Sequence, residues 1–189
     1  VEGFKVGRIL EKLGQKGQDT CELYFDEVRV PASALLGGVE GKGFAHLMTE
    51  LPYERLMLGV SAIASIERAI ALTVDYTKQR KAFGKTLFEM QNTRFVLADV
   101  QAQAVMARAF VDQCIVQIDQ GKLDTVTASI AKLTLSELEC SVIDRCLQLF
   151  GGYGYMLEYP ITQMYADARV QRIYGGSSEI MKEIIARSL

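Results

Sequence analysis

The chain has 189 residues, of which 49% are hydrophobic and 23% are charged, and its formal net charge is −2. This composition is typical of a globular protein with enough apolar side chains for a sizeable core. The small net charge, without any block of like charges, argues against binding to nucleic acid or to an anionic membrane surface. We also expect no membrane span and no signal peptide.

Residues 1–37 are predicted to form β-structure. Polar and apolar residues alternate along 21–26 and again along 28–30, and Pro31 ends the run. About three short strands cannot bury a core alone, so we expect them to belong to a larger sheet or to pack on helices. Because the chain lacks an initiator methionine and begins inside a predicted strand, we expect it to be part of a longer protein.

Helical periodicity follows a glycine-rich joint at residues 37–43. Apolar residues at three- and four-residue steps predict one long helix from about 44 to 79, roughly 50 Å long at about 1.5 Å per residue. Residues 81–85 interrupt the pattern. Three more helices are predicted downstream: they run from about 89 to 120, from about 124 to 150, and from Pro160 onward.

A last helix is predicted to begin near Ser177. A serine can cap a helix at this position, and Glu179 falls in the first turn, where the helix dipole favours a carboxylate. The predicted fold class is therefore mainly α, an up-down helical bundle preceded by a few strands. We place the domain boundary between residues 37 and 38, so that the bundle comprises 38–189.

Residues that commonly bind metals are few and scattered. The four cysteines include no Cys-x-x-Cys pair, and the chain has a single histidine. We therefore expect no metal site. Reduced thiols fit a compartment such as the bacterial cytoplasm or the mitochondrial matrix.

Two segments more than 100 residues apart carry the most specific signal. The chain reads Leu-Pro-Tyr-Glu-Arg-Leu over residues 51–56 and Arg-Ile-Tyr-Gly-Gly-Ser-Ser-Glu-Ile over residues 172–180. Together they resemble the acyl-CoA dehydrogenase family, and the resemblance covers essentially the whole chain. Most of that family carries its catalytic glutamate directly after the tyrosine of the second motif, where this chain has Gly175. Long-chain and isovaleryl members take the base from the position that Glu54 occupies.

The resemblance implies dehydrogenation of an acyl-CoA thioester to the trans-2-enoyl-CoA. Glu54 is then the base that removes the α-proton, while hydride passes from the β-carbon to N5 of FAD. Such a base has to be shielded from water, as on a helix that lines the acyl channel. The alternative reading of Glu54 is a solvated carboxylate early in a helix.

The Tyr174–Gly175 turn is expected to bind the thioester. In the family, the backbone N–H after this tyrosine donates to the thioester carbonyl, and Gly175 retains that N–H although it lacks a carboxylate. Such a donor stabilises enolate-like charge. Tyr174 and Arg55 are expected near the substrate, with a structural ion pair as an equal alternative for Arg55. A glycine pair alone indicates only a tight turn.

The basic segment 78–85 is expected to bind FAD. The resemblance places Arg80 near the pyrophosphate of the FAD of a neighbouring subunit, and Phe83 against the same cofactor. A cation and a planar ring suit a dinucleotide. Without the resemblance, the segment reads as a solvated basic loop between helices.

Two further pairs of residues are expected to contact FAD. In the glycine-rich segment 148–155, Gln148 and Gly152 correspond to residues that approach the ADP part across the dimer interface. Ser177 and Glu179 match positions that contact the flavin in relatives. Read alone, the glycines indicate an ordinary helix end.

The resemblance thus implies an FAD enzyme that passes electrons to an electron-transfer flavoprotein and forms a homodimer or a homotetramer. The strands would be the end of the family's β-barrel-like middle domain. The motifs are most similar to the long-chain branch. An isovaleryl-type enzyme, an acyl-CoA oxidase of the same fold and a non-catalytic oligomerising bundle remain alternatives. Because the rest of the FAD site has no counterpart here, we expect the isolated chain to hold FAD weakly and to be inactive.

Overall fold

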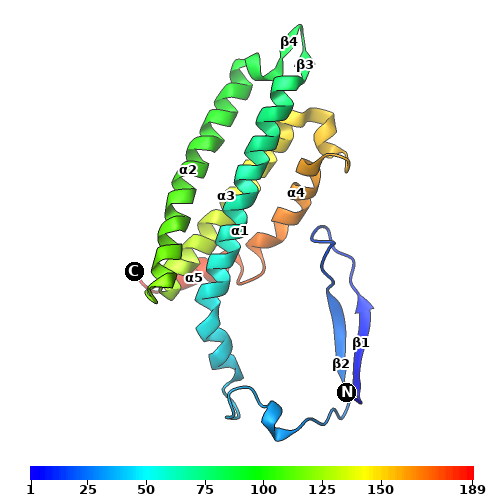
Figure 1. The fold of residues 1–189 in the computed structure, drawn as a ribbon, viewed down its shortest axis with the longest axis vertical. Helices are drawn as coiled ribbons and strands as arrows, with labels where there is room; N and C mark the ends of the chain where they lie inside the picture. The colour runs from blue at the N-terminus through cyan, green and yellow to red at the C-terminus, as the bar shows by residue number, and fades with distance from the viewer. The chain divides into compact units, whose positions relative to one another are not determined.

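Five α-helices form most of the chain in the computed structural model, which describes residues 1–189 (Figure 1). Their boundaries lie within two residues of those predicted from the sequence, and the mainly-α fold class is confirmed. The helices are α1 (Gly43–Gln79), α2 (Gln91–Asp119), α3 (Thr125–Phe150), α4 (Pro160–Ala168) and α5 (Ser178–Ala186).

The chain divides into two compact units, residues 1–50 and 51–189. In the first unit, β1 (Phe4–Ile9) pairs with β2 (Cys21–Phe25) in an antiparallel ladder that carries an irregularity near its middle. The third predicted strand, at 28–30, does not form. Glu27 has a φ of 47°, which turns the chain out of the extended direction just after the ladder with β1 ends at the Phe4–Phe25 pair.

A small hairpin joins α1 to α2, where only an interruption was predicted. β3 (Lys81–Ala82) pairs with β4 (Lys85–Thr86), and both residues of the connecting turn have positive φ, as in the tightest hairpins. Strands of two residues are too short to give an alternating pattern, which is why the sequence did not predict them.

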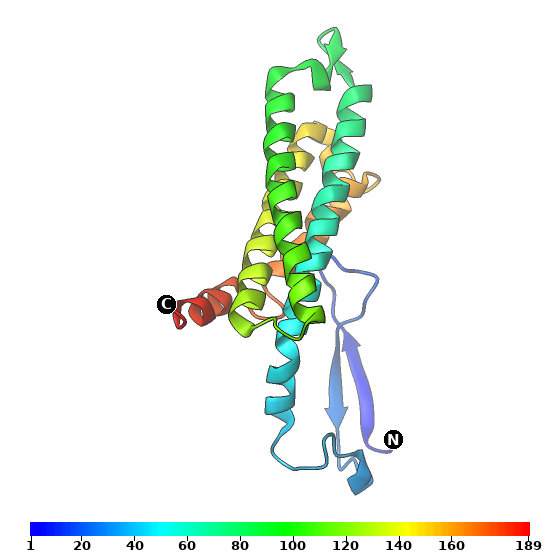
Figure 2. The same cartoon turned by 60° about the vertical axis from the view of Figure 1, so that its left-hand side comes forward.

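The apolar core lies in the second unit, between α1, α2, α3 and α4. Aliphatic side chains spaced three or four residues apart on each long helix face inward, and each contributes about 1.5–3 kcal/mol of transfer free energy. Figure 2 shows the three long helices running alongside one another, with α5 at the end opposite the hairpin. Fully buried residues of this core include Ile63, Ile66, Val100, Val111, Leu135 and Ile143.

Contrary to the expectation from the sequence, α1 is long and apolar enough to cross a membrane by length and composition. Core helices of water-soluble bundles have the same property. The middle of α1 carries Glu67, which forms an ion pair with Arg108 of α2 at 2.7 Å, and ionised groups at such a position are costly in lipid. We therefore interpret α1 as the central helix of the bundle.

Candidate functional site

The turn before α5 carries the first group of candidate residues. Gly175 and Gly176 have φ values of 64° and 105°, which L side chains rarely adopt. A Cβ atom at Gly175 would lie 2.5 Å from Cδ1 of Leu58 in α1. The turn therefore packs closely against α1, and a side chain at position 175 would require both the Leu58 side chain to move and a strained positive φ.

Arg55 links α1 to this turn. Its Nε donates to the carbonyl oxygen of Gly175 at 3.4 Å, and its Nη1 donates to Oγ of Ser129 in α3 at 3.2 Å. Burial lowers the pKa of Arg55, and the charge of Glu54 acts in the opposite direction. The hydrogen bonds of this guanidinium go to a carbonyl and a hydroxyl, and no carboxylate is among its partners.

Glu54 lies on an exposed part of α1 and makes no hydrogen bond or ion pair within the chain. Residues four apart share a helix face, so Glu54 lies one helical turn before Leu58, the residue of α1 that packs against Gly175. Its neighbours Tyr53 and Met57 are large apolar side chains that are about half exposed. Glu54 thus lies on the part of α1 that packs against the Gly175 turn, but the chain does not itself shield its carboxylate from water.

Lys132 of α3 contacts the same turn, and sequence reasoning did not single it out. Its side chain is fully buried, and its Nζ donates to the carbonyl oxygen of Gly176 at 2.6 Å. Burial and the nearby Arg55 lower the pKa of Lys132, while Glu137 and Glu179 act to raise it. A signal was present: Lys132 falls on the buried face of α3, four residues after Ala128.

Glu137 of α3 accepts hydrogen bonds from residues before and after the two glycines of the turn. Its Oε1 accepts from Nε of Arg172 at 2.8 Å and from Oγ of Ser178 at 2.7 Å. Burial acts to raise the pKa of Glu137, but these two hydrogen bonds outweigh burial and the pKa is lowered. The turn is thus held by α3 before and after its two glycines.

The remaining candidates of this group surround the turn. Ser177 caps α5, with its Oγ accepting from the N–H of Ile180 at 3.5 Å, as predicted from the sequence. Glu179 is exposed in the first turn of α5, where its own backbone N–H and the Ser177 hydroxyl lower its pKa. Tyr174 is 38% exposed, and burial, with a further contribution from Glu139, raises its pKa.

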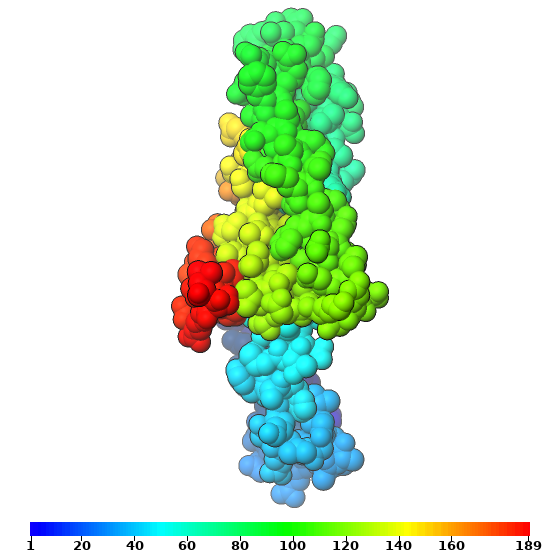
Figure 3. Space-filling model, turned by 90° about the vertical axis from the view of Figure 1, so that its left-hand side faces the viewer, coloured from blue at the N-terminus to red at the C-terminus, as the bar shows by residue number.

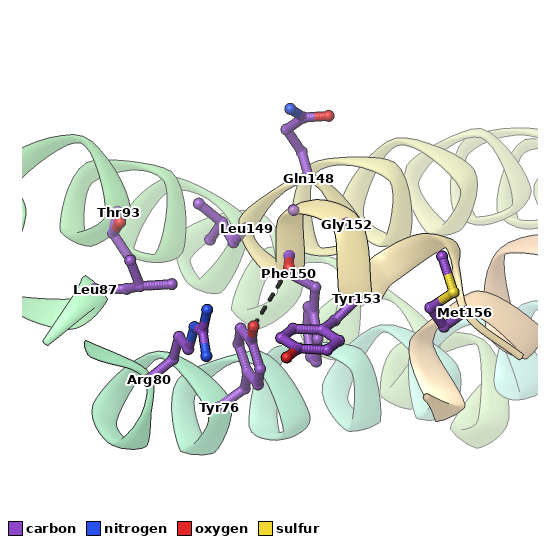
Figure 4. Close-up of a pocket in the computed structure, with 11 residues that line it drawn as sticks. Tyr76, Arg80, Leu87, Thr93, Gln148, Leu149, Phe150, Gly152, Tyr153 and Met156 are labelled. Carbon is purple, nitrogen blue, oxygen red and sulfur yellow. Dashed lines mark hydrogen bonds between the residues drawn. The ribbon is translucent and has the colours of Figure 1, made fainter. Parts of the chain in front are cut away.

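The second group of candidates lines a pocket of about 660 Å³ formed by the C-terminal ends of α1 and α3 and the segments that follow them (Figure 4). Arg80, Gln148 and Gly152 all line it. The guanidinium of Arg80 lies over the ring of Tyr153, 5.2 Å from its centroid. Gln148 extends away from the other labelled side chains, and no atom lies within 4 Å of the position that a Cβ at Gly152 would take.

Stacked aromatic rings support this pocket. The rings of Tyr76 and Phe150 stack with centroids 4.1 Å apart, and Tyr159 packs edge-on against both. The hydroxyl of Tyr76 donates to the carbonyl oxygen of Phe150 at 3.3 Å, drawn as the dashed line in Figure 4. This contact ties the end of α1 to the end of α3, so the helix ends that border the pocket are held together by the fold.

Phe83 does not line the pocket but lies at the tip of the neighbouring hairpin. It is 96% exposed and has a φ of 54°. A bulky residue at positive φ is strained, and an aromatic ring fully in water loses its packing energy. The positive φ belongs to the two-residue hairpin turn, and the ring has no packing partner within the chain.

The two groups of residues are far apart. Arg55 lies in α1 and Arg80 directly follows that helix, some 25 residues later, which corresponds to about 38 Å at about 1.5 Å per residue. The helix therefore carries one group near its beginning and the other at its end.

Comparisons with known proteins agree in every region of the chain. Residues 41–189 match the sequence family described as "Acyl-CoA dehydrogenase, C-terminal domain". The chain is 52% identical over 189 residues to the mitochondrial long-chain specific acyl-CoA dehydrogenase of Mus musculus, which covers all of this chain and 44% of that protein.

Solved structures show the same fold. An acyl-CoA dehydrogenase from Geobacillus kaustophilus superimposes with a TM-score of 0.95 at 45% identity, over 99% of this chain and 49% of that one. An acyl-CoA dehydrogenase complexed with FAD, from Bacillus anthracis, superimposes with a TM-score of 0.94 at 27% identity, over 99% and 35%. The chain thus spans about half, or less, of the length of these relatives.

Proposed function

The chain belongs to the acyl-CoA dehydrogenase family, and from this premise we propose that it forms the C-terminal part of a flavoenzyme that converts an acyl-CoA to its trans-2-enoyl-CoA. The observation that carries the proposal is the pairing of Glu54 with the Gly175 turn. Glu54 directly precedes Arg55, whose Nε donates to the Gly175 carbonyl at 3.4 Å, and Lys132 of α3 donates to the next carbonyl, so a carboxylate of α1 adjoins a turn that is held from two helices.

In this proposal the Gly175 N–H binds the carbonyl oxygen of the thioester. As the α-proton leaves, negative charge accumulates on that oxygen, and a preorganised donor stabilises it more than it stabilises the bound substrate. The loss of one such donor typically costs about 10²–10³ in rate. The positive φ of Gly175 directs the N–H without a side chain in the way.

Glu54 is the proposed base for the α-proton. Most of the family places its glutamate at position 175, but here a Cβ at that position would meet Leu58. The exposed apolar neighbours Tyr53 and Met57 indicate that another part of the full-length protein covers this face and excludes water. Tyr174 and Arg55 are proposed to stand beside the substrate, with Arg55 acting through its bond to the turn.

FAD is the proposed cofactor, and when bound it accepts the hydride that leaves the β-carbon. Arg80 fits the pyrophosphate, and the backbone at Gly152 is open for close approach by a phosphate or ribose. Gln148 offers an amide next to them, and Phe83 offers an exposed ring. Ser177 and Glu179 are proposed to contact the flavin at the other group of residues.

The distance between the two groups supports an oligomer. About 38 Å along α1 exceeds the reach of one extended FAD molecule, so each chain is proposed to contribute to two cofactors, as in a homodimer or homotetramer. Figure 3 shows α2 along the surface of the second unit. This helix exposes Phe95, Met106 and Val116, as expected of a helix that packs against another subunit.

The identity to the mouse enzyme and the relocated glutamate favour the long-chain branch. An electron-transfer flavoprotein is the proposed acceptor, and the bacterial cytoplasm or mitochondrial matrix the proposed location. An isovaleryl-type specificity or an oxidase of the same fold would use the same residues. Oxygen consumption in the absence of an acceptor protein separates the oxidase from the dehydrogenase.

The test is anaerobic bleaching of the flavin in the full-length protein by a panel of acyl-CoAs. Glu54→Gln should retain FAD and lose bleaching, since it keeps the size of the side chain and removes the base. Glu158→Gln, a substitution at an exposed glutamate outside both groups, serves as the matched control and should bleach like wild type. Equal bleaching by Glu54→Gln would refute the assignment of the base, and the chain length that bleaches fastest identifies the substrate.

A further inference from the structure

We infer that Lys132 is a positioning residue for the proposed dehydrogenation. Together with Arg55 it fixes the Gly175–Gly176 turn, so that the Gly175 N–H points at the thioester oxygen. The positive charges of the two side chains also lie near that oxygen. This inference deepens the proposed function and rests on it. Lys132 touches neither substrate nor cofactor in this scheme; it acts through the backbone carbonyl that it holds.

The first argument is geometric. Two adjacent carbonyl oxygens of the turn accept hydrogen bonds from two cations on different helices, Arg55 on α1 and Lys132 on α3. On the other side, the N–H of Tyr174 donates to the carbonyl oxygen of Val170 at 3.1 Å. The peptide plane that carries the Gly175 N–H therefore lies between planes that are held. Two successive glycines would otherwise be the most mobile residues of the segment.

The second argument concerns charge. Lys132 is fully buried and has no carboxylate as an ion-pair partner; the nearest candidate by sequence, Glu137, is bound to Arg172 and Ser178. A buried cation that forms no ion pair and lies close to a second cation is unfavourable for folding, and the charges of Glu137 and Glu179 offset this only in part, because the pKa of Lys132 is lowered. Stability alone does not account for it, because a neutral donor would satisfy the Gly176 carbonyl equally well.

The third argument is where the charge lies. The thioester oxygen becomes negative next to Gly175 in the transition state, and a buried cation that is not tied up in an ion pair stabilises it most effectively. Arg55 and Lys132 both lie on the carbonyl side of the turn. Two neighbouring cations, which are unfavourable for folding, thus become favourable when negative charge develops on the thioester oxygen.

The test uses full-length, FAD-loaded protein and three variants. Lys132→Met removes the charge and the donor with little change in side-chain length, and Lys132→Gln removes the charge but keeps an N–H donor. Lys122→Met makes the same charge change at an exposed lysine of the loop before α3. The first readout is the rate and concentration dependence of flavin bleaching by acyl-CoA.

The second readout does not depend on turnover. A bound 3-oxoacyl-CoA ionises to an enolate that is followed by its ultraviolet absorbance as a function of pH, so it reports how strongly the site stabilises negative charge. We expect Lys132→Met to slow bleaching about tenfold or more with little change in KM, and to shift the ionisation of the bound ligand upward by about one pH unit, which is the same tenfold factor. Lys132→Gln should show the larger part of this shift, and Lys122→Met none.

The outcomes separate this inference from the proposed function. If wild type is not bleached by any acyl-CoA, the proposed function is wrong. If wild type is bleached and the ligand ionises at the same pH in Lys132→Met as in Lys122→Met, the role of Lys132 is refuted while the function stands. Should Lys132→Met fail to fold, Lys132→Gln decides, because it keeps an N–H donor and removes the charge.

Discussion

Glu139→Gln tests what it costs the bundle to bury a carboxyl group that lacks a counter-ion. Glu139 lies in α3 with 3% of its surface exposed, and its Oε2 has no hydrogen-bond partner. Burial raises the pKa of Glu139 from its ordinary value of 4.5 to about 7; a hydrogen bond with Ser65 acts against this and the charge of Asp167 adds to it.

The sign of the effect on stability follows from proton binding. Between pH 4.5 and 7 the folded chain holds a proton on Glu139 that the unfolded chain has released. The stabilisation is complete below pH 4.5 and is lost as the pH rises through about 7. A shift of roughly 2.5 units corresponds to about 3 kcal/mol, since one unit corresponds to about 1.36 kcal/mol.

Glutamine has the shape of the protonated acid and does not titrate, so Glu139→Gln should remove this pH dependence. We expect the variant to be more stable than wild type by up to about 3 kcal/mol at pH 8, and to differ by less than about 1 kcal/mol at pH 4.5. The measurement is urea-induced unfolding followed by circular dichroism at several pH values. Only the difference between the two proteins counts, because other carboxylates also titrate in this range.

A matched control is available in Glu158→Gln, which changes an exposed glutamate of the segment before α4. Its stability should run parallel to that of wild type from pH 4.5 to 8. If Glu139→Gln also ran parallel to wild type, the carboxyl group would be ionised in the folded chain. The account of its burial would then be wrong.

Two further substitutions test the geometry of the turn and of the hairpin. Gly175→Ala should destabilise the folded chain by at least about 1 kcal/mol, because it adds strain at positive φ and a contact with Leu58. The control is Gly121→Ala, which measures the strain alone, since Gly121 has a positive φ and no atom near the added Cβ. A Gly175→Ala melting temperature equal to that of wild type would contradict the close packing. Phe83→Ala should leave the melting temperature of the isolated chain unchanged and lower the FAD content of the full-length protein; full retention of FAD would exclude Phe83 from the cofactor site.

The helices could be predicted from the sequence because their apolar residues repeat with the helical period and glycines mark their ends. The hairpin between α1 and α2 could not, since its strands have two residues each. The strand expected at 28–30 has the right alternation but no partner to pair with. Alternation indicates only that a segment suits a sheet, and the neighbouring strand decides whether it joins one.

The candidate site was predictable only in part. Motifs pointed to Arg80, Gln148 and Gly152, and the structure places all three in one pocket. Lys132 and Glu139 were not singled out, because charged residues are normally assigned to the surface. Helical spacing does place both on the apolar face of α3, but it does not show whether a charged residue at such a position is buried or reaches the solvent.

The length of α1 fixes the distance between the two groups of candidate residues. A single residue inserted between Arg55 and Arg80 would lengthen the helix by about 1.5 Å and rotate everything beyond it by about 100°. Even an insertion of seven residues, which nearly restores the direction, would move the pocket by about 10 Å relative to the turn. We therefore expect insertions and deletions among relatives to fall outside this stretch, in the connections between helices, so that the span of α1 is inherited as a fixed unit even where its side chains change.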